Sequence, residues 1–528
     1  MSQKIIYIIS YISAVILFSL AFHFQGTGDD GDSVFHYLYA HWAPFDTKLY
    51  FNHWAKPLFV LLASPWAQFG FIGIKIFNVV NFLLTQIVLY KICQKLNFQL
   101  PWLPSLLYLL CPMGLYYNLS GLTEPLFALL ISVVIYLLFI DKLLLAIILI
   151  SFLPFIRSEG LFVILLAIPY LIFIRKFQYF LLLSTGHIIY GLAGMHVYNY
   201  DFLWTIHKIP YPINMGSYGQ GVWFHFIEYL PEVTGEVFKI LFLIACIGIY
   251  FPISNLIKKR DEKQSWILLF FIFGLVFSFF LFHSYAWAIG KFNSFGLTRV
   301  LLAVLPLMII MISVLFESIY TKIPKIIFYV GLLFLIALQL IFIFNPSQRF
   351  HLNSSHFKEK PAQIMIKDLV QHMKNEFPDW GLYHKLYANM NVALYSGSNP
   401  FHASSEYISA ILHRSEFPYR TFLIWDSWYS KIESKVSLED VNKDSLFTEI
   451  KSFQQLDQYG KEHKATLFKY LPQNFGGYDP EKLGAILKGM EQDPTWLKYI
   501  GEKAMERNIS LDSMMLIDAK WMIDQEKK

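Results

Sequence analysis

The stretch IIYIISYISAVILFSLAFHFQGTGDDGDSVFHYLYAHW (residues 5–42) joins an apolar helix to an acidic cluster. Residues 5–24 are long and apolar enough to span a bilayer. Asp29, Asp30 and Asp32 follow within four positions. Carboxylates held at a membrane surface cost free energy, so their position marks them as candidates for a functional site.

The composition is that of a membrane protein. Of the 528 residues, 55% are hydrophobic and 15% are charged, and the mean hydropathy is +0.45. The positive charge lies mostly at helix ends, and no basic run is interleaved with aromatic residues, so nucleic acid is not an expected partner. The three cysteines lie in apolar stretches and predict no disulfide framework. We expect the first span to be a retained anchor, because no small-residue cleavage site follows it.

Apolar runs bounded by charges, Pro or Gly predict about eleven membrane spans. They lie near residues 5–24, 71–92, 102–117, 124–140, 143–156, 160–174, 178–197, 238–257, 266–283, 299–317 and 326–344.

The Lys and Arg residues of the short loops predict the orientation of these spans. All of them fall on one side if the N-terminus is cytoplasmic: Lys4, Lys91, Lys95, Lys142, Arg175, Lys176, Lys258, Lys259, Arg260, Lys263, Lys322 and Lys325. The other side then receives the acidic loop, the turn at 117–124, Arg157, the loops 198–237 and 284–298, and the whole C-terminus. We therefore expect a multi-pass protein of the inner (cytoplasmic) membrane with a periplasmic C-terminal domain.

The chain divides into three predicted parts: a membrane module (1–345), a small α/β domain (346–472) and a helical tail (473–528). A linker is expected at 350–361. RTFLIWD (420–426) and ATLFKYL (465–471) read as buried strands, while 361–377 and 445–463 read as amphipathic helices. In the tail, Ser510 and Asp512 are candidate caps for the last helix.

Each charged candidate has a structural and a functional interpretation. In the structural interpretation, the aspartates belong to a solvated loop or cap the helix near Ser33. In the functional one, an aspartate accepts a proton from an acceptor hydroxyl during sugar transfer. Lys56, in HWAKPLF with His53, is a snorkelling lysine or a cation for a phosphate leaving group. Arg299 is a second candidate for phosphate.

Two further candidates lie on the same predicted side. Arg157 either pairs with Glu159 to fasten two helix ends or contributes to the substrate site. Glu124 suits a helix start, between Thr123 as a cap and Pro125 in the first turn, and stays a secondary candidate for substrate binding. The Gly- and aromatic-rich loop 207–236 reads as a mobile cover for a substrate groove.

No zinc, P-loop or dinucleotide motif is present in the sequence, so no cofactor is expected. Three aspartates are able to bind a divalent cation. Lys56 favours neutralisation of phosphate by protein cations instead.

Four motifs, in this order, resemble the GT-C-fold glycosyltransferases of the protein-mannosyltransferase and aminoarabinose-transferase type. They are GDDGDSVFHYLYA (28–40), KPLFVLLASP (56–65), TEPLFALL (123–130) and GLTRVLLAVLP (296–306). The chain departs from that pattern in having Asp-Asp-Gly-Asp for an Asp-Glu pair and Lys-Pro-Leu for Lys-Pro-Pro-Leu.

The resemblance implies a membrane α-helical, GT-C-like bundle and a polyprenyl-phosphate sugar donor. It implies that an aspartate of the first loop is the base, placed on Asp32 with Asp30 as the alternative, and that Lys56 and Arg299 contact the donor phosphate. The acceptor is then a protein or a lipid-linked glycan, and the C-terminal domain is available to partners in a membrane complex. A transporter of lipid-linked sugar and a non-catalytic scaffold remain the alternatives.

Overall fold

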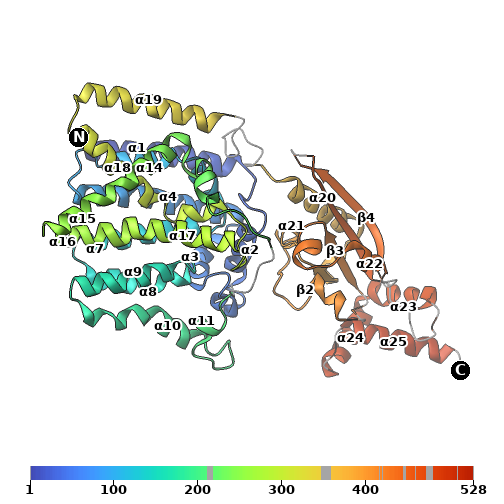
Figure 1. The fold of residues 1–528 in the computed structure, drawn as a ribbon. Coiled ribbons are helices and arrows are strands. Elements are labelled where there is room, and N and C mark those ends of the chain that lie inside the picture. The colour runs from blue at the N-terminus through green and yellow to red at the C-terminus, as the bar shows by residue number, and fades with distance from the viewer. Residues whose placement is uncertain are drawn as a thin grey trace. The chain divides into compact units, whose positions relative to one another are not determined.

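The computed structural model describes residues 2–210, 218–345, 358–414, 417–418, 420–443, 447–457, 460–470, 478, 480–507, 509 and 511–526. It forms two compact units, a helical unit (Met1–Glu359) and a C-terminal unit (Lys360–Lys528). The long helices of the helical unit run alongside one another (Figure 1). Its α-helices are α1 (Ser2–His23), α2 (Asp32–Trp42), α3 (Pro57–Ala67), α4 (Phe71–Lys95), α5 (Leu103–Leu109), α6 (Pro112–Tyr117), α7 (Glu124–Phe139), α8 (Leu143–Phe152), α9 (Gly160–Phe173), α10 (Thr185–Gly194), α11 (Trp204–His207), α12 (His225–Glu228), α13 (Leu230–Thr234), α14 (Glu236–Ala245), α15 (Tyr250–Ile257), α16 (Glu262–Ile267), α17 (Leu275–Ala288), α18 (Leu305–Tyr320) and α19 (Lys325–Phe344).

Five helical stretches of the described chain are long and apolar enough to cross a membrane: Gln3–His23, Phe71–Lys95, Glu236–Ile257, Glu262–Ala288 and Lys325–Phe344. Five shorter apolar helices accompany them: Pro57–Ala67, Glu124–Phe139, Leu143–Phe155, Gly160–Phe173 and Leu305–Tyr320. These helices indicate a multi-pass membrane protein. That the chain crosses the membrane about eleven times stays a prediction.

Some predicted spans are interrupted in the structure. The run 102–117 divides into α5 and α6, and the break comes at Cys111, whose backbone is extended (φ −86°, ψ 117°). Cys111 precedes Pro112, and a residue before proline is disfavoured in helical geometry. The run 178–197 consists of short 3₁₀ turns followed by α10.

Contacts between loops distinguish the two ends of the helical unit. At one end, Lys263 forms an ion pair with Asp141. Glu317 accepts a hydrogen bond of 2.7 Å from the backbone N–H of Gln99. Each contact connects a helix end, that of α16 or α18, with a loop that the charge pattern assigns to the same side. The acidic loop lies among a separate set of loops, described below.

The C-terminal unit contains a five-stranded sheet with the order β2-β1-β3-β5-β4. Strand β1 pairs in parallel with β2 and β3, while β5 pairs antiparallel with β3 and β4. Helix α20 packs against β4 and β5. The elements are α20 (Pro361–Glu376), β1 (His384–Tyr387), α21 (Asn391–Ser396), β2 (Ser405–Tyr407), β3 (Thr421–Asp426), α22 (Leu438–Lys443), β4 (Phe447–Leu456) and β5 (Glu462–Tyr470).

The predicted strands at 420–426 and 465–471 and the helix at 361–377 are confirmed, but the predicted helix at 445–463 is wrong. That segment forms β4 and the start of β5. Apolar residues recur every third position in β4 and imitate a helical period. The register shifts between Glu449 and Lys451, so Ile450 is an extra residue that breaks the alternation expected of a strand.

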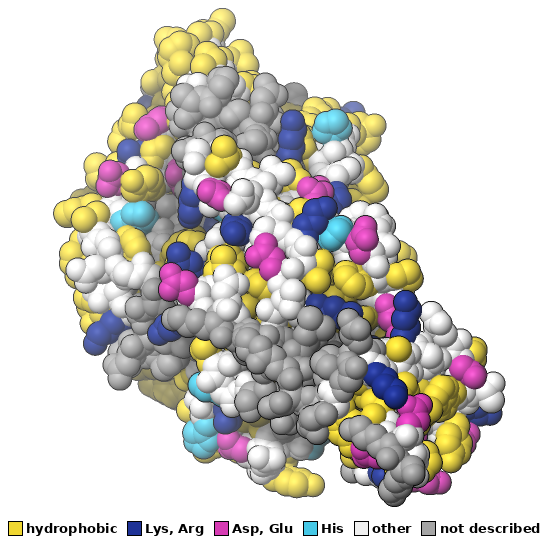
Figure 2. Space-filling view, turned by 90° about the vertical axis from the view of Figure 1, so that its right-hand side faces the viewer, with side chains coloured by type: hydrophobic (Ala, Val, Ile, Leu, Met, Phe, Trp, Pro, Cys, Tyr) yellow, Lys and Arg dark blue, Asp and Glu magenta, His cyan; other side chains and the backbone are white. Residues whose placement is uncertain are grey.

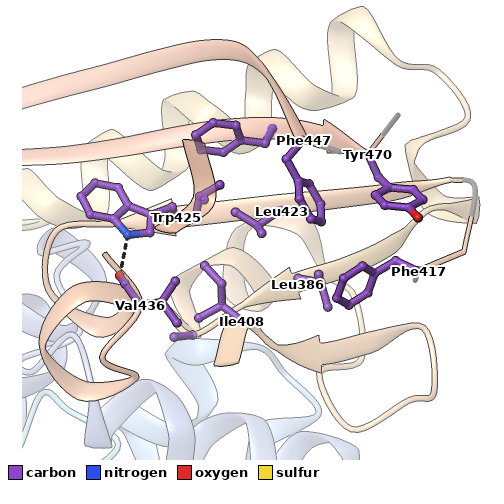
Figure 3. Close-up of a cluster of buried hydrophobic side chains, with 11 residues drawn as sticks. Leu386, Ile408, Phe417, Leu423, Trp425, Val436, Phe447 and Tyr470 are labelled. Carbon is purple, nitrogen blue, oxygen red and sulfur yellow. Dashed lines mark hydrogen bonds between the residues drawn. The ribbon is translucent and has the colours of Figure 1, made fainter. Parts of the chain in front are cut away.

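A buried apolar cluster lies on one side of this sheet, and Figure 3 shows its members from several strands pointing toward one another. Leu386, Leu423 and Phe468 come from three adjacent strands and are almost fully buried. The indole N–H of Trp425 donates a hydrogen bond of 2.9 Å to the carbonyl of Val436 (Figure 3). This bond satisfies the one polar group of a buried side chain, so the cluster is a conventional core.

The helical tail is present as α23 (Pro480–Gln492), α24 (Pro494–Glu506) and α25 (Leu511–Glu526), which share a core of their own. Asp493 caps α24 by accepting the backbone N–H groups of Thr495 and Trp496. The expected linker at 350–361 lies mostly outside the described residues, as do the cap at Ser510 and residues 211–217 of the predicted cover. Lys, Arg, Asp and Glu side chains are interspersed over the face of the C-terminal unit in Figure 2, which is typical of a surface facing water.

Candidate functional site

The acidic loop is fixed between α1 and α2 by the segment that precedes α7. Tyr116 donates its hydroxyl to the carbonyl of Gly28 at 2.6 Å, and the backbone N–H of Gly121 donates to Ser33 Oγ at 2.6 Å. Gly28 has a φ of +76°, and a Cβ there would lie 2.7 Å from the Cβ of Ser120. Only glycine tolerates both that backbone conformation and that approach. The aspartates therefore stand on a rigid loop.

Arg299 joins two of the three aspartates. Its Nη1 lies 2.7 Å from Oδ2 of Asp29, and its Nη2 forms an ion pair with Oδ2 of Asp32. The arginine side chain is 6% exposed. It is the second residue of a 3₁₀ turn (Thr298–Ala303) that leads into α18. The structure thus brings residues 267 or more positions apart in sequence into one buried guanidinium–carboxylate cluster.

The two paired aspartates differ in their surroundings. Asp29 is 22% exposed, and its Oδ1 accepts the backbone N–H groups of Gly31 and Ser33 at 2.9 and 3.3 Å. Its carboxylate therefore has the structural role of holding the start of α2. Asp32 is 45% exposed, and no other described residue bonds to its Oδ1. Of these two, Asp32 has the more exposed side chain and the fewer hydrogen bonds.

A second group of charges continues from Arg299 through Glu124. Oε1 of Glu124 lies 3.8 Å from Nε of Arg299 and 2.9 Å from Nη1 of Arg157. Arg157 also pairs with Glu159 at 2.7 Å, and His283 Nε2 lies 3.5 Å from the same Glu159 oxygen. Burial alone would raise the pKa of Glu159, but Arg157 and His283 outweigh it and hold that pKa well below its usual range.

Arg157 fastens two helix ends, because Glu124 begins α7 and Glu159 precedes α9. Its Nη1 also donates to Thr123 Oγ1 at 3.1 Å. Thr123 makes no side-chain hydrogen bond that caps α7, so the expected cap at this position is replaced by a contact with arginine. These contacts support the interpretation that Arg157 holds two helix ends together.

Lys56 lies beside this second group. Its ammonium group donates a hydrogen bond of 2.8 Å to Ser158 Oγ. The residue has a φ of +70°, in the region that side chains rarely adopt, and it is buried. Burial lowers the pKa of Lys56 to about 8, although Glu159 acts in the opposite direction. Lys56 therefore combines a strained backbone with a buried cation at the start of α3.

His53 and Asp30 are not among the predicted site residues that the ion pairs described above connect. His53 Nε2 is 3.0 Å from the carbonyl of Thr205, so its hydrogen bond goes to α11. Burial, together with Lys56, lowers the pKa of His53 to about 4, and the ring is neutral at pH 7. Asp30 is partly exposed between the two paired aspartates. The structure brings the other predicted site residues into one continuous region: Asp29, Asp32, Arg299, Glu124, Arg157 and Lys56.

Three members of this region were absent from the sequence predictions. Ser158 and His283 carry no local signal, because their partners lie 102 and 124 positions away. His36 is a buried residue of α2. It stacks on Trp54 at 4.9 Å and lies near Arg299 and Lys56, and burial lowers its pKa to about 3. A neutral histidine at the centre of a charged region cannot be recognised from spacing alone.

The region lacks the arrangement expected of a metal site. Within the described part of the chain, no group of three or more His, Cys, Asp or Glu side chains is placed to hold a metal ion. Two of the three aspartates face Arg299 instead. The chemistry that these side chains offer is a partly exposed carboxylate, a buried lysine and a set of ion pairs that orients them.

Comparison with known proteins supports the architecture. No protein-family model and no curated protein matches the sequence. The structure is similar to the crystal structure of ArnT from Cupriavidus metallidurans bound to undecaprenyl phosphate, with a TM-score of 0.50 and 9% sequence identity. The match covers 87% of this chain and 97% of that one. The chain therefore has an ArnT-like membrane fold.

Proposed function

We propose that the protein is an integral membrane glycosyltransferase that moves a hexosyl or pentosyl group from a polyprenyl-phosphate donor to an acceptor hydroxyl. The observation that carries this proposal is the clustering of Asp32, Arg299 and Lys56 at one end of an ArnT-like helical unit. The undecaprenyl phosphate bound to ArnT supports a lipid phosphate as the donor's carrier. A carboxylate base and a cation for a leaving phosphate are the two groups that such a transfer needs.

In the proposed step, Asp32 takes the proton of the acceptor hydroxyl as that oxygen attacks the anomeric carbon of the donor sugar. A new carbon–oxygen bond to the acceptor forms, and the bond between the anomeric carbon and the phosphate oxygen breaks. The electron pair of the broken bond leaves with the polyprenyl phosphate. A single displacement of this kind inverts the anomeric centre. The partly exposed carboxylate of Asp32 suits this role better than that of Asp29, whose oxygens already accept two backbone N–H groups and pair with Arg299.

Lys56 is the proposed cation for the departing phosphate. Charge develops on that phosphate as the bond to the sugar breaks, so a fixed ammonium group stabilises the transition state more than the ground state. Burial strengthens the interaction because fewer water molecules screen it. Direct contact of Arg299 with phosphate stays a prediction, since two aspartates occupy its Nη atoms in this state. We assign Arg299 the task of orienting Asp32.

The site is proposed to face the periplasm. The loops rich in Lys and Arg would then be cytoplasmic, and the chain would lie in the inner membrane. The C-terminal unit would stand outside the membrane, where its mixed surface charge is suited to water and to a protein or glycolipid acceptor, or to partners in a membrane complex (Figure 2).

A reconstituted assay tests the function. The purified chain is placed in proteoliposomes with a panel of polyprenyl-phosphate hexoses and pentoses labelled in the sugar, and with solubilised membranes as the source of acceptor. We expect label to pass from the organic-extractable donor to protein or glycan, with release of polyprenyl phosphate. Movement of intact donor across the bilayer without transfer would identify a transporter. Neither transfer nor movement for any donor would favour a scaffold.

The transfer rate should depend on the protonation of Lys56. Because its pKa lies at about 8, kcat/KM for the donor is expected to fall roughly tenfold per pH unit above pH 8. An ordinary lysine would not produce this decline until about pH 10.4. The donor is a phosphodiester and keeps its charge over this range, so the decline belongs to the protein. Initial rates at low donor concentration between pH 6 and 10 measure it.

Two variants control this experiment. Lys56→Arg keeps the charge at every pH tested and should remove the decline, whatever its effect on the maximal rate. Lys258→Met changes an exposed lysine in another loop and should retain the decline of the parent chain. A decline that survives in Lys56→Arg would assign the titration to another group.

A further inference from the structure

Glu124 lies between the two arginines of the site, and its side chain is 2% exposed. One carboxylate oxygen is shared between Arg157 and Arg299, at 2.9 and 3.8 Å. The other, Oε2, is buried and has no hydrogen-bond partner among the described residues. A carboxylate enclosed in this way affects the reaction through its neighbours and does not itself contact the sugar.

Arg299 is the neighbour through which Glu124 would act. Its three nitrogens face three different carboxylates, those of Asp29, Asp32 and Glu124. A guanidinium group beside a carboxylate makes that carboxylate a weaker base, because it favours the ionised form. A second carboxylate on the far side of the same guanidinium offsets part of this effect. Asp32 therefore keeps more affinity for a proton than an isolated pair with arginine would leave it.

We propose that Glu124 is a positioning residue that keeps Asp32 basic by sharing Arg299 with it. The inference rests on the proposed function, in which Asp32 accepts the proton of the acceptor hydroxyl. It changes the expected role of Glu124 from binding substrate to tuning the base. It also explains why a carboxylate is buried at the start of α7, where a helix start alone would need only an exposed one.

The other charged groups near Asp32 define what a pH profile would report. The surrounding protein raises the pKa of Asp32, Arg299 lowers it, and Asp29 and Glu124 raise it. The Asp32 side chain is 45% exposed, so water reaches it as well as these charged neighbours.

Three groups near Asp32 or Arg299 do not titrate in the acid range. His36, on the same helix as Asp32, is neutral above about pH 3. Lys56 titrates on the alkaline side, near pH 8. Tyr117, which faces Arg299, is a phenol and is uncharged at acid pH. We therefore expect the acid limb of kcat/KM to report carboxylates, among them those that pair with Arg299.

The test is the pH profile of Glu124→Gln. Loss of the Glu124 charge should strengthen the hold of Arg299 on Asp32, so the acid limb of kcat/KM should move down by about 0.5–1 pH unit. A weaker base should also lower kcat by about 3–10-fold, with little change in donor KM. Glu124→Asp keeps the charge and should restore the position of the acid limb.

Glu159→Gln is the matched control. It removes a carboxylate from the same Arg157, but Glu159 lies on the side of Lys56, whose pKa it raises. Its alkaline limb should therefore move to lower pH, while its acid limb stays in place. The two glutamine variants would thus shift opposite limbs of one profile, which a general loss of folding cannot do.

The outcomes separate the inference from the function on which it rests. No transfer by the parent chain with any donor would overturn the proposed function itself. Transfer by the parent with an unmoved acid limb in Glu124→Gln, or a rise in donor KM alone, would overturn only the role of Glu124. If Glu124→Gln does not fold, Arg157→Gln serves instead. It removes the other cation that pairs with Glu124, so Glu124 should interact more strongly with Arg299 and the acid limb should move to higher pH. An unmoved limb in that variant would also overturn the inference.

Discussion

Replacing Asp32 with Asn is expected to lower kcat for sugar transfer by about 10²–10⁴-fold, the usual contribution of a general base. Asn has nearly the shape of Asp but cannot take the proton of the acceptor hydroxyl. The donor should still bind, because Lys56 and its contact with Ser158 are unchanged. The loss should therefore appear in kcat, with donor KM within a few-fold of the parent value.

The other two aspartates are the controls for this experiment. Asp30→Asn changes a neighbouring carboxylate on the same loop and should retain most of the rate. Asp29→Asn removes a group that accepts two backbone N–H groups and pairs with Arg299, so its main effect should be on thermal stability. Equal losses in Asp30→Asn and Asp32→Asn would contradict the assignment of the base. Full transfer by all three variants would exclude a mechanism that depends on the acidic loop.

The sequence predicts the side of the site better than its internal contacts. Charged residues are rare in an apolar chain, so those near span ends can be assigned to a side from Lys and Arg alternation alone. Arg299 and the acidic loop fall on one side by that argument, and the structure joins them. Which carboxylate each arginine faces depends on how α7, α9 and the turn before α18 pack. No local pattern in the sequence contains that information.

The same limit explains the errors in secondary structure. Pro112 lies inside a run that is otherwise apolar enough to continue as one helix, and the extended backbone of Cys111 before it divides that run into α5 and α6. In β4, the extra residue Ile450 shifts the apolar side chains by one position. Pairing with β5 holds the strand despite a helical period, which is a tertiary contribution that propensity does not include.

Arg299→Met is expected to lower the free energy of unfolding by about 3 kcal/mol, the lower end of the range for breaking a buried ion pair. Methionine fills a similar volume but leaves Asp29, Asp32 and Glu124 without the cation they share. The lower end applies because water still reaches the partly exposed Asp32. Equilibrium unfolding in mixed micelles at pH 7 measures the loss. Arg260→Met, at an exposed arginine of another loop, should change stability by less than about 0.5 kcal/mol.

The pH dependence of that loss distinguishes lost charge from lost packing. Without Arg299, three neighbouring carboxylates repel one another, so their pKa values in the folded variant rise above those of the unfolded chain. A carboxylate with a raised pKa destabilises the fold at pH values above that pKa, and the effect disappears once it is protonated. The deficit of Arg299→Met relative to the parent should therefore shrink as the pH falls from 7 to about 4. Adding Asp29→Asn to Arg299→Met should recover part of the deficit at pH 7, because one of the repelling charges is gone. A deficit that is equal at both pH values and unchanged in the double variant would mean that the arginine stabilises this end of the unit by packing, and that its ion pairs with the acidic loop contribute little.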